Sequence, residues 1–142
     1  MKILLTGASS YVGARIYFDL SKDFDVIGTY NATRLSKSFV KLDVTNKDGV
    51  VNVFEKEKPN IIIHIAANAN SRWCEANPEL AVALNETSTK YIVDEANKIK
   101  AKVIFLSSFA AYEPNNVYAK TKFNSEEIIK KTKAGWVILR AS

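Results

Sequence analysis

The sequence is poor in the residues that mark several classes of protein. It has one cysteine, Cys74, and one histidine, His64, among 142 residues. A single cysteine excludes an internal disulfide and suits a reducing cytoplasm. Without a second histidine or a cysteine cluster, no metal site is expected. No apolar run approaches the roughly 18 residues of a membrane span, and five glycines and three prolines are too few for a disordered or fibrous chain.

The net charge and the length of the chain further restrict the class of protein. The formal net charge is +5, and the lysines and arginines are spread along the chain rather than gathered in one segment. We therefore expect no nucleic-acid partner, whereas a mildly basic surface suits an anionic cofactor and substrate. With 47% hydrophobic residues, the chain is long enough to bury a core. These properties predict one globular, cytoplasmic domain over residues 1–142.

Short apolar segments alternate with helical patterns from end to end. Strands are predicted at 2–6, 25–29, 39–42, 60–66, 102–107 and 136–140, and helices at 11–20, 46–57, 78–98 and 117–133, with Gly135 as the last C-cap. Repeated β–α–β units imply a doubly wound parallel α/β sheet of six strands in the order 3-2-1-4-5-6, the Rossmann fold. Because the chain ends after the sixth strand, we expect it to lack a C-terminal substrate domain.

A glycine-containing turn, TGASSYVG at 6–13, joins the first strand to the first helix. Such a turn aims backbone N–H groups and the helix N-terminus at a phosphate. Gly7 would permit the tight turn and Gly13 the close packing of helix on strand. Ser10 takes the place of the usual middle glycine, where its hydroxyl could donate to phosphate. An ordinary strand-to-helix turn is the alternative.

Two later segments concern the choice of nucleotide. The residues after the second strand, among them Tyr30, Asn31 and Arg34, include no acid for the ribose 2′-hydroxyl of NAD. Arg34 could accommodate a 2′-phosphate, which favours NADP, although a solvated loop charge is equally open. Asp43, after the third strand, either accepts from an adenine amino group or caps a turn.

The segment YAKTK at 118–122 indicates a reactive phenol. Tyr118 and Lys122 are four residues apart on a predicted helix and so share a face. An ammonium beside the phenol would lower its pKa and let Tyr118 exchange a proton near neutral pH. Ser108, at the end of the fifth strand, could hydrogen-bond the same substrate oxygen. This spacing also arises by chance on helices. His64, in a buried strand, is expected to be a satisfied core residue.

Together these segments resemble the extended short-chain dehydrogenase/reductases, and within them the dTDP-4-dehydrorhamnose reductases. The resemblance runs through TGASSYVG (6–13), KLDVTN (41–46), IIIHIAA (61–67), CEANPELAVALN (74–85), VIFLSS (103–108), YAKTK (118–122) and VILRAS (137–142). The chain departs from the family at Ser10, at Arg72 and Trp73, and in the spacing of Ser108 and Tyr118, which are only ten positions apart.

The resemblance implies hydride transfer, with NADP or alternatively NAD, on a nucleotide-activated sugar. It implies a catalytic set of Ser108, Tyr118 and Lys122, with Tyr118 as general acid/base. The predicted cofactor contacts, from the residues and the resemblance together, are Gly7, Ser10, Tyr11, Val12 and Gly13 near the pyrophosphate, Tyr30, Asn31, Arg34, Asp43 and Val44 near the adenosine, and Ala66, Ala67, Asn68 and Lys122 near the nicotinamide.

Two other functions stay open. One is a regulatory subunit that keeps the nucleotide site without catalysis, as in the β subunit of methionine adenosyltransferase, and the short loop at 109–117 favours it. The other is an NAD(P)-sensing transcriptional regulator. The expected partner is a small-molecule substrate, a nucleotide sugar, with no nucleic acid and no membrane, and a homodimer is left open.

Overall fold

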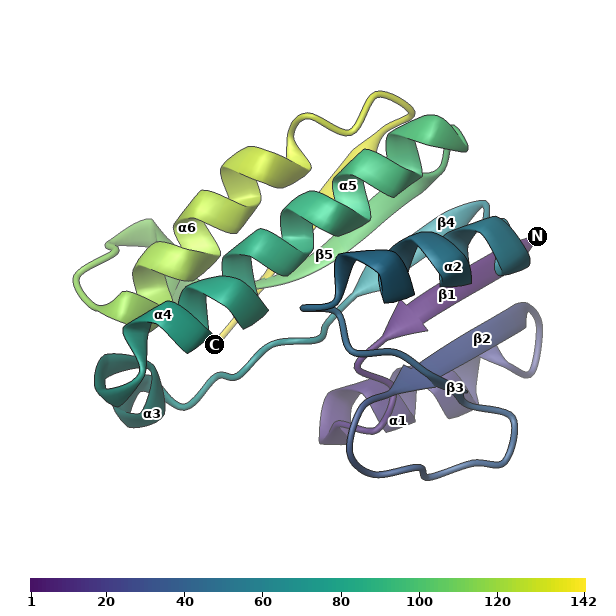
Figure 1. Cartoon of the computed structure of the whole chain (residues 1–142), viewed down its shortest axis with the longest axis horizontal. Coiled ribbons are helices and arrows are strands. Elements are labelled where there is room, and N and C mark those ends of the chain that lie inside the picture. Colours follow the sequence, from purple (N-terminus) through teal and green to yellow (C-terminus); the bar gives the residue numbers. More distant parts are fainter.

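A computed structural model describes all residues, 1–142, as a sheet between two layers of helices (Figure 1). Six parallel strands lie in the order β3-β2-β1-β4-β5-β6. They are β1 (Lys2–Thr6), β2 (Asp25–Tyr30), β3 (Val40–Lys41), β4 (Ile61–His64), β5 (Lys102–Ser108) and β6 (Trp136–Ala141). The predicted doubly wound topology is confirmed.

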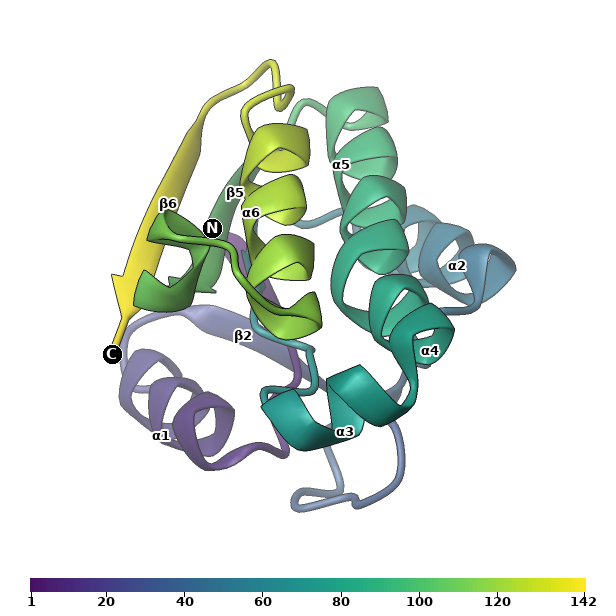
Figure 2. The same cartoon turned by 90° about the vertical axis from the view of Figure 1, so that its left-hand side faces the viewer.

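Helices cover the two faces of the sheet unequally. They are α1 (Tyr11–Leu20), α2 (Lys47–Glu57), α3 (Ser71–Ala76), α4 (Pro78–Val82), α5 (Ser88–Lys98) and α6 (Val117–Ile129). α1 lies alone on one face, where Ile16 and Leu20 pack against buried side chains of β1 and β2. α2, α5 and α6 lie on the other face over a larger core that includes Phe54, Ile62 and Phe105 (Figure 2). This packing places the carboxyl ends of β1, β4 and β5 at one edge of the sheet.

The helix predicted at 78–98 is one continuous rod with an irregular turn. Pro78 occupies the first helical position, where its missing N–H costs nothing. Between α4 and α5 the backbone forms a π-helical turn, η1 (Ala83–Thr87). The short helix α3 was not predicted. It is capped by Asn70, whose side chain accepts from the backbone N–H of Trp73 (3.0 Å).

Several predicted boundaries differ for local reasons. β4 ends at His64 because the Thr6 hydroxyl takes the backbone N–H groups of Ile65 and Ala66, at 3.1 and 3.2 Å. α6 ends at Ile129, so the prediction that Gly135 is its C-cap is wrong. Gly135, with φ of +125°, instead lies just before β6.

β6 forms an exposed edge of the sheet. Its apolar residues Trp136, Val137 and Leu139 are 43%, 47% and 51% exposed. β6 is the outermost strand and pairs on one side only, with β5. No helix combines the length and the apolar character needed to cross a membrane.

Candidate active site

The turn after β1 is shaped by close backbone approach. Gly7 has φ of +71°, and a Cβ there would lie 2.9 Å from the backbone nitrogen of Ala66. A Cβ on Gly13 would lie 2.1 Å from the carbonyl oxygen of Gly7. Both predicted glycine roles therefore have a steric basis: α1 starts in contact with the turn itself.

Ser10 is the residue that caps the first helix. Its φ of −73° is one that any residue adopts, so the backbone conformation at this middle position does not require glycine. Its hydroxyl donates to the Gly7 carbonyl (2.8 Å) and accepts from the Gly13 N–H (3.0 Å), which makes it the N-cap of α1. The hydroxyl proton is thus already used within the turn. The backbone N–H groups of Tyr11 and Val12, which precede any intrahelical acceptor, are what the turn offers to an anion.

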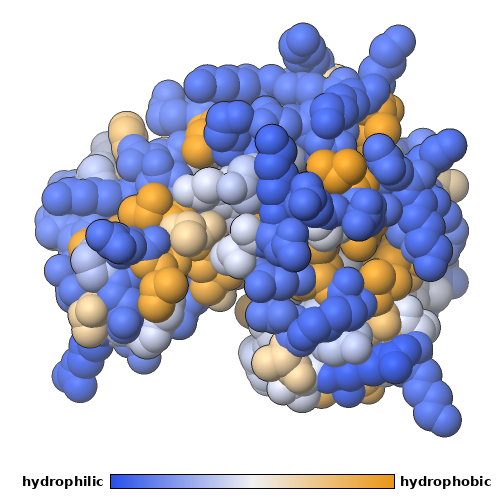
Figure 3. Space-filling view, in the orientation of Figure 1, coloured by the Kyte–Doolittle hydropathy of each residue, from blue (hydrophilic) through white to orange (hydrophobic).

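A crevice of about 490 Å³ opens at the carboxyl edge of the sheet. It unites segments far apart in the sequence: Ser10, Tyr11 and Val12 of the turn, Ile65, Ala67 and Ala69 after β4, Leu106, Ser107 and Ser108 of β5, Tyr118 and Lys122 of α6, and Ala141 and Ser142. The surface is indented between the part that carries α3 and α4 and the part that carries α1 (Figure 3). The glycine turn and the predicted catalytic set therefore share one crevice.

Tyr118 is half-buried in this crevice, and its environment opposes ionisation. Burial raises the pKa of the phenol, while a hydrogen-bonding contact with the Ser108 side chain acts in the opposite direction. The prediction that Lys122 lowers this pKa is wrong, because the Lys122 ammonium donates to the Leu106 carbonyl (2.7 Å) instead. At neutral pH the phenol keeps its proton and is available as an acid.

Lys122 itself is almost completely buried, with 3% exposure. Its Nζ lies 4.1 Å from the centre of the Phe105 ring. Burial lowers the pKa of this ammonium to about 8, and the negative charge of Glu126 works against that shift. Lys122 is thus charged at neutral pH, although its pKa lies close to that pH.

A second group gathers at the carboxyl end of β2. Arg34 and Lys41 lie 5.7 and 5.4 Å from the centre of the Tyr30 ring. Lys41 Nζ donates to both the carbonyl and the side-chain oxygen of Asn31. Sequence reasoning missed Lys41, although its pairing with Tyr30 follows from the parallel register of β2 and β3. Two cations thus lie beside Tyr30, and the segment 30–34 itself contains no carboxylate.

Asp43 and Val44 both have structural roles that do not depend on a cofactor. One oxygen of Asp43 accepts from the backbone N–H (2.9 Å) and the hydroxyl (2.6 Å) of Thr45, which is the turn-capping alternative. The Val44 side chain is buried in the larger core, with 4% exposure. Any adenine contact would use the other oxygen of Asp43 and the backbone of Val44.

A buried chain of hydrogen bonds runs from β1 through β4 to α5. The Thr6 hydroxyl already accepts two N–H groups, so it donates to Nδ1 of His64 (2.7 Å). His64 therefore carries its proton on Nε2 and donates to Thr89 (3.2 Å), which donates to the carbonyl of Asn85 (3.2 Å). Burial lowers the pKa of His64 to about 3, with the positive charge of Lys122 adding to the shift. The predicted core role of His64 is confirmed.

Asn85 is a positioning residue that sequence reasoning missed. It sits in η1, with its amide against the backbone of Asn68: its oxygen accepts the Asn68 N–H (2.8 Å) and its nitrogen donates to the Asn68 carbonyl (3.0 Å). The amide also donates to Thr121 of α6 (3.3 Å). In the sequence Asn85 stands directly after the apolar run 80–84, and no clear signal points to this role. Asn85 fixes the loop that follows β4 and borders the crevice.

Comparison with known proteins establishes the family. Residues 1–142 match the RmlD substrate binding domain family, so the chain belongs to it. A dTDP-4-dehydrorhamnose reductase of Salmonella typhimurium is 31% identical, over all of this chain and 51% of that protein. Methionine adenosyltransferase 2 subunit beta of Xenopus laevis is 27% identical, over 98% of this chain and 46% of that protein. The resemblance predicted from sequence is confirmed.

Solved structures agree with this assignment at the level of the fold. A dTDP-4-dehydrorhamnose reductase of Bacillus anthracis, solved in complex with NADP, superposes with a TM-score of 0.84. It is 21% identical, and the match covers 98% of this chain and 52% of that one. The chain thus spans about half the length of the relatives it matches.

Proposed function

We propose that this chain is the cofactor-binding part of an NADP-dependent oxidoreductase that acts on a nucleotide-activated sugar. The observation that carries the proposal is the crevice in which the start of α1 faces Ser108, Tyr118 and Lys122. In open α/β sheets of this order, ligands bind outside the carboxyl ends of the strands. Membership of the family, and a neighbour of the same fold that holds NADP, support this assignment.

The dinucleotide would lie across the sheet edge. The N–H groups of Tyr11 and Val12 would hold the pyrophosphate, because a helix N-terminus favours negative charge. Gly7 and Gly13 leave the room that this approach needs. The loop Ala66–Asn68, fixed by Asn85, would border the nicotinamide.

The cations beside Tyr30 support NADP rather than NAD. Arg34 and Lys41 would pair with the 2′-phosphate, and Asn31 would contact the ribose. We expect Arg34→Ala or Lys41→Ala to weaken NADPH binding about tenfold and NADH binding by less than twofold, measured by calorimetric titration. Lys47→Ala, at an exposed residue of α2, is the matched control. Equal losses for both cofactors would contradict the 2′-phosphate role.

When bound, the nicotinamide would supply or accept the hydride. The chain's own residues would manage the proton. Tyr118, protonated at neutral pH, would donate to the carbonyl oxygen that accepts the hydride, and Ser108 would hydrogen-bond the same oxygen. Lys122 would hold the nicotinamide ribose through its ammonium.

Replacement of the phenol tests the catalytic proposal. We expect Tyr118→Phe to lower kcat for NADPH-dependent reduction of a dTDP-4-keto sugar by about 10²-fold or more, with the Kd for NADPH unchanged. Tyr91→Phe, on a residue that packs against the larger core, controls for loss of a phenol elsewhere. Full activity in Tyr118→Phe would remove Tyr118 from the mechanism.

The second candidate is a regulatory subunit that binds NADP without turnover. The 27% identity to methionine adenosyltransferase 2 subunit beta favours it. It predicts NADPH binding in the wild type, no reduction of any dTDP-keto sugar, and an enzyme partner. A homodimer and a cytoplasmic location stay predictions, the former checked by light scattering.

A further inference from the structure

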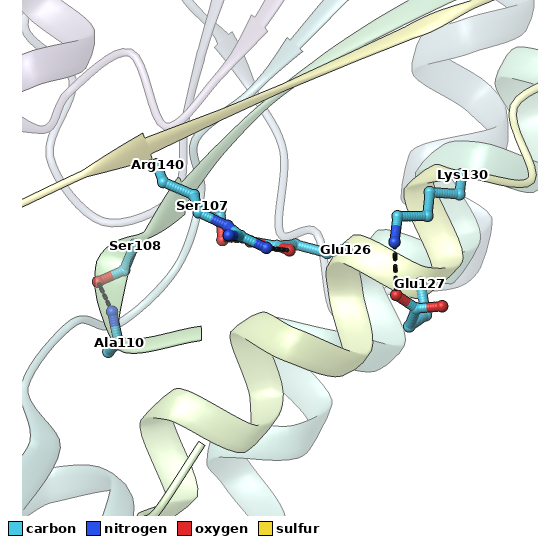
Figure 4. Close-up of polar contacts among 7 residues, drawn as sticks. All are labelled: Ser107, Ser108, Ala110, Glu126, Glu127, Lys130 and Arg140. Atoms are coloured by element: carbon cyan, nitrogen blue, oxygen red, sulfur yellow. Dashed lines mark hydrogen bonds and ion pairs between the residues drawn. The ribbon is translucent and has the colours of Figure 1, made fainter. Parts of the chain in front are cut away.

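A buried carboxylate lies behind the catalytic set. Glu126 follows Lys122 by one helical turn on α6, and it is only 1% exposed. Its Oε1 accepts from the Ser107 hydroxyl (2.6 Å) and from Arg140 Nε (3.0 Å), and its Oε2 accepts from Arg140 Nη2 (2.7 Å) (Figure 4). Burial alone would raise its pKa, but the hydrogen bonds from Arg140 and Ser107 outweigh burial and lower it. Glu126 therefore stays ionised.

These contacts join three elements at the crevice. Side chains alternate along a strand, so Ser107 faces α6 while Ser108 is free to cap the turn after β5 by accepting from the Ala110 N–H (3.1 Å) (Figure 4). Arg140 brings in β6 through a two-bond fork, the geometry that holds a carboxylate most firmly. The Glu126 carboxylate thus sets the position of the β5 end against α6, and with it the facing of Ser108 and Tyr118.

The same carboxylate is the negative charge that raises the pKa of Lys122. On β5 the ammonium donates to the Leu106 carbonyl and lies over the Phe105 ring. From β4 it faces His64, which is neutral. On α6 itself, Tyr118 is a protonated phenol. The titratable neighbour of Tyr118 on α3 is the thiol of Cys74. Arg140 of β6 is bound to Glu126, which is the one anion that acts on Lys122.

We propose that Glu126 is a positioning residue for the Ser108–Tyr118–Lys122 set: it clamps β5 and β6 to α6 and places a buried negative charge one helical turn from Lys122. The role in catalysis rests on the proposed function. The effect on Lys122 belongs to the protein alone and can be measured without cofactor. Arg140 belongs to the same arrangement, because it keeps the Glu126 carboxylate ionised in its buried position.

The direct test is the titration of Lys122 by NMR in protein with labelled lysine side chains, assigned through Lys122→Arg. Glu126→Gln keeps the shape and removes the charge, so we expect the titration to move from about 8 to lower pH, by about one unit. The matched control is Glu127→Gln, the next residue, which is exposed and pairs with Lys130 (2.8 Å) (Figure 4). It should leave the titration of Lys122 in place.

A second variant acts on the same carboxylate from its other side. Arg140→Gln removes the guanidinium that holds Glu126 ionised, so Glu126 should take up a proton more readily and the titration of Lys122 should again move to lower pH. This variant keeps the proposal testable if Glu126→Gln does not fold. An unchanged titration in either variant, or an equal shift in Glu127→Gln, would overturn the proposal.

The functional readout is the pH dependence of NADPH binding. Because the pKa of Lys122 should be about one unit lower in Glu126→Gln, this variant should bind NADPH about fivefold more weakly than the wild type at pH 8. At pH 6 the two proteins should bind NADPH within about twofold of each other. A merely structural loss would weaken binding equally at both pH values, and that result would contradict the charge role. A wild type that binds no NADPH would end the proposed function, while the titration would still decide what Glu126 does to Lys122.

Discussion

His64 allows a sharp test of the buried hydrogen-bond chain. Its pKa in the folded protein is about 3 against an ordinary value of 6.5, because burial and the charge of Lys122 both disfavour the imidazolium. The unfolded chain would bind a proton at the ordinary value. A base whose pKa is depressed by folding gives its full stabilisation above pH 6.5 and loses it as the pH falls toward 3. Acid should therefore weaken the fold well above the range in which carboxylates titrate.

The size of the effect follows from the two pKa values. Between pH 7.5 and pH 5.5 the free energy of unfolding should fall by about 1.4 kcal/mol, and by up to about 1.4 kcal/mol for each further pH unit. The window from pH 7.5 to 5.5 lies above the ordinary pKa of Asp and Glu. Since His64 is the only histidine in the chain, most of the loss in this window belongs to it.

Urea unfolding at pH 7.5, 6.5 and 5.5 measures this loss, and NMR follows the single imidazole directly. In the folded protein the ring should show no titration above about pH 4. His64→Gln, if it folds, should flatten the pH dependence. A folded-state titration near pH 6.5, or equal stability at pH 7.5 and 5.5, would refute the hydrogen-bond chain as described.

Two further substitutions test the packing around the crevice by urea unfolding. Thr6→Val removes three hydrogen bonds from a fully buried side chain and should lower the free energy of unfolding by about 2–4 kcal/mol. The control Thr33→Val, in the exposed loop, should change it by less than about 0.5 kcal/mol. Equal effects of the two variants would show that the Thr6 hydroxyl is not a structural partner. Gly13→Ala, which places a Cβ against a backbone carbonyl, should cost about 2 kcal/mol or more and abolish NADPH binding. Gly49→Ala, where the nearest atom would be 3.6 Å away, should instead stabilise the protein by about 0.5 kcal/mol, and a stable, cofactor-binding Gly13→Ala variant would contradict the close approach.

The order of the strands could be predicted because it follows from local patterns and one rule of handedness. Each strand is a short apolar run between turn residues, and right-handed crossovers then leave few arrangements. Gly7 and Gly13 were also readable, because a tight turn between strand and helix needs small residues. Tyr118 and Lys122 were found through their spacing and Ser108 through its place at the end of the fifth strand, and the fold brings them to the crevice that the glycine turn enters.

Features that depend on distant contacts could not be read from the sequence. The direction of the Tyr118 pKa shift depends on where the Lys122 ammonium points, and a carbonyl of β5 decides that. Lys41 acquires its place beside Tyr30 only through the pairing of β2 and β3. Glu126 reads as an ordinary helix surface residue until Ser107 and Arg140 enclose it.

The irregular turn η1 constrains the number of residues in the helix that contains it. Each residue of a helix rotates the side chains beyond it by about 100°. Loss of one residue within Ala83–Thr87 would turn Thr89 away from His64 and Ile92 out of the core, and would strand the amide of Asn85. Substitutions in this turn replace one contact, but a deletion would misalign everything from there to Lys98. Among homologous chains we therefore expect this turn to keep its residue count and its Asn85, while its other positions vary in sequence.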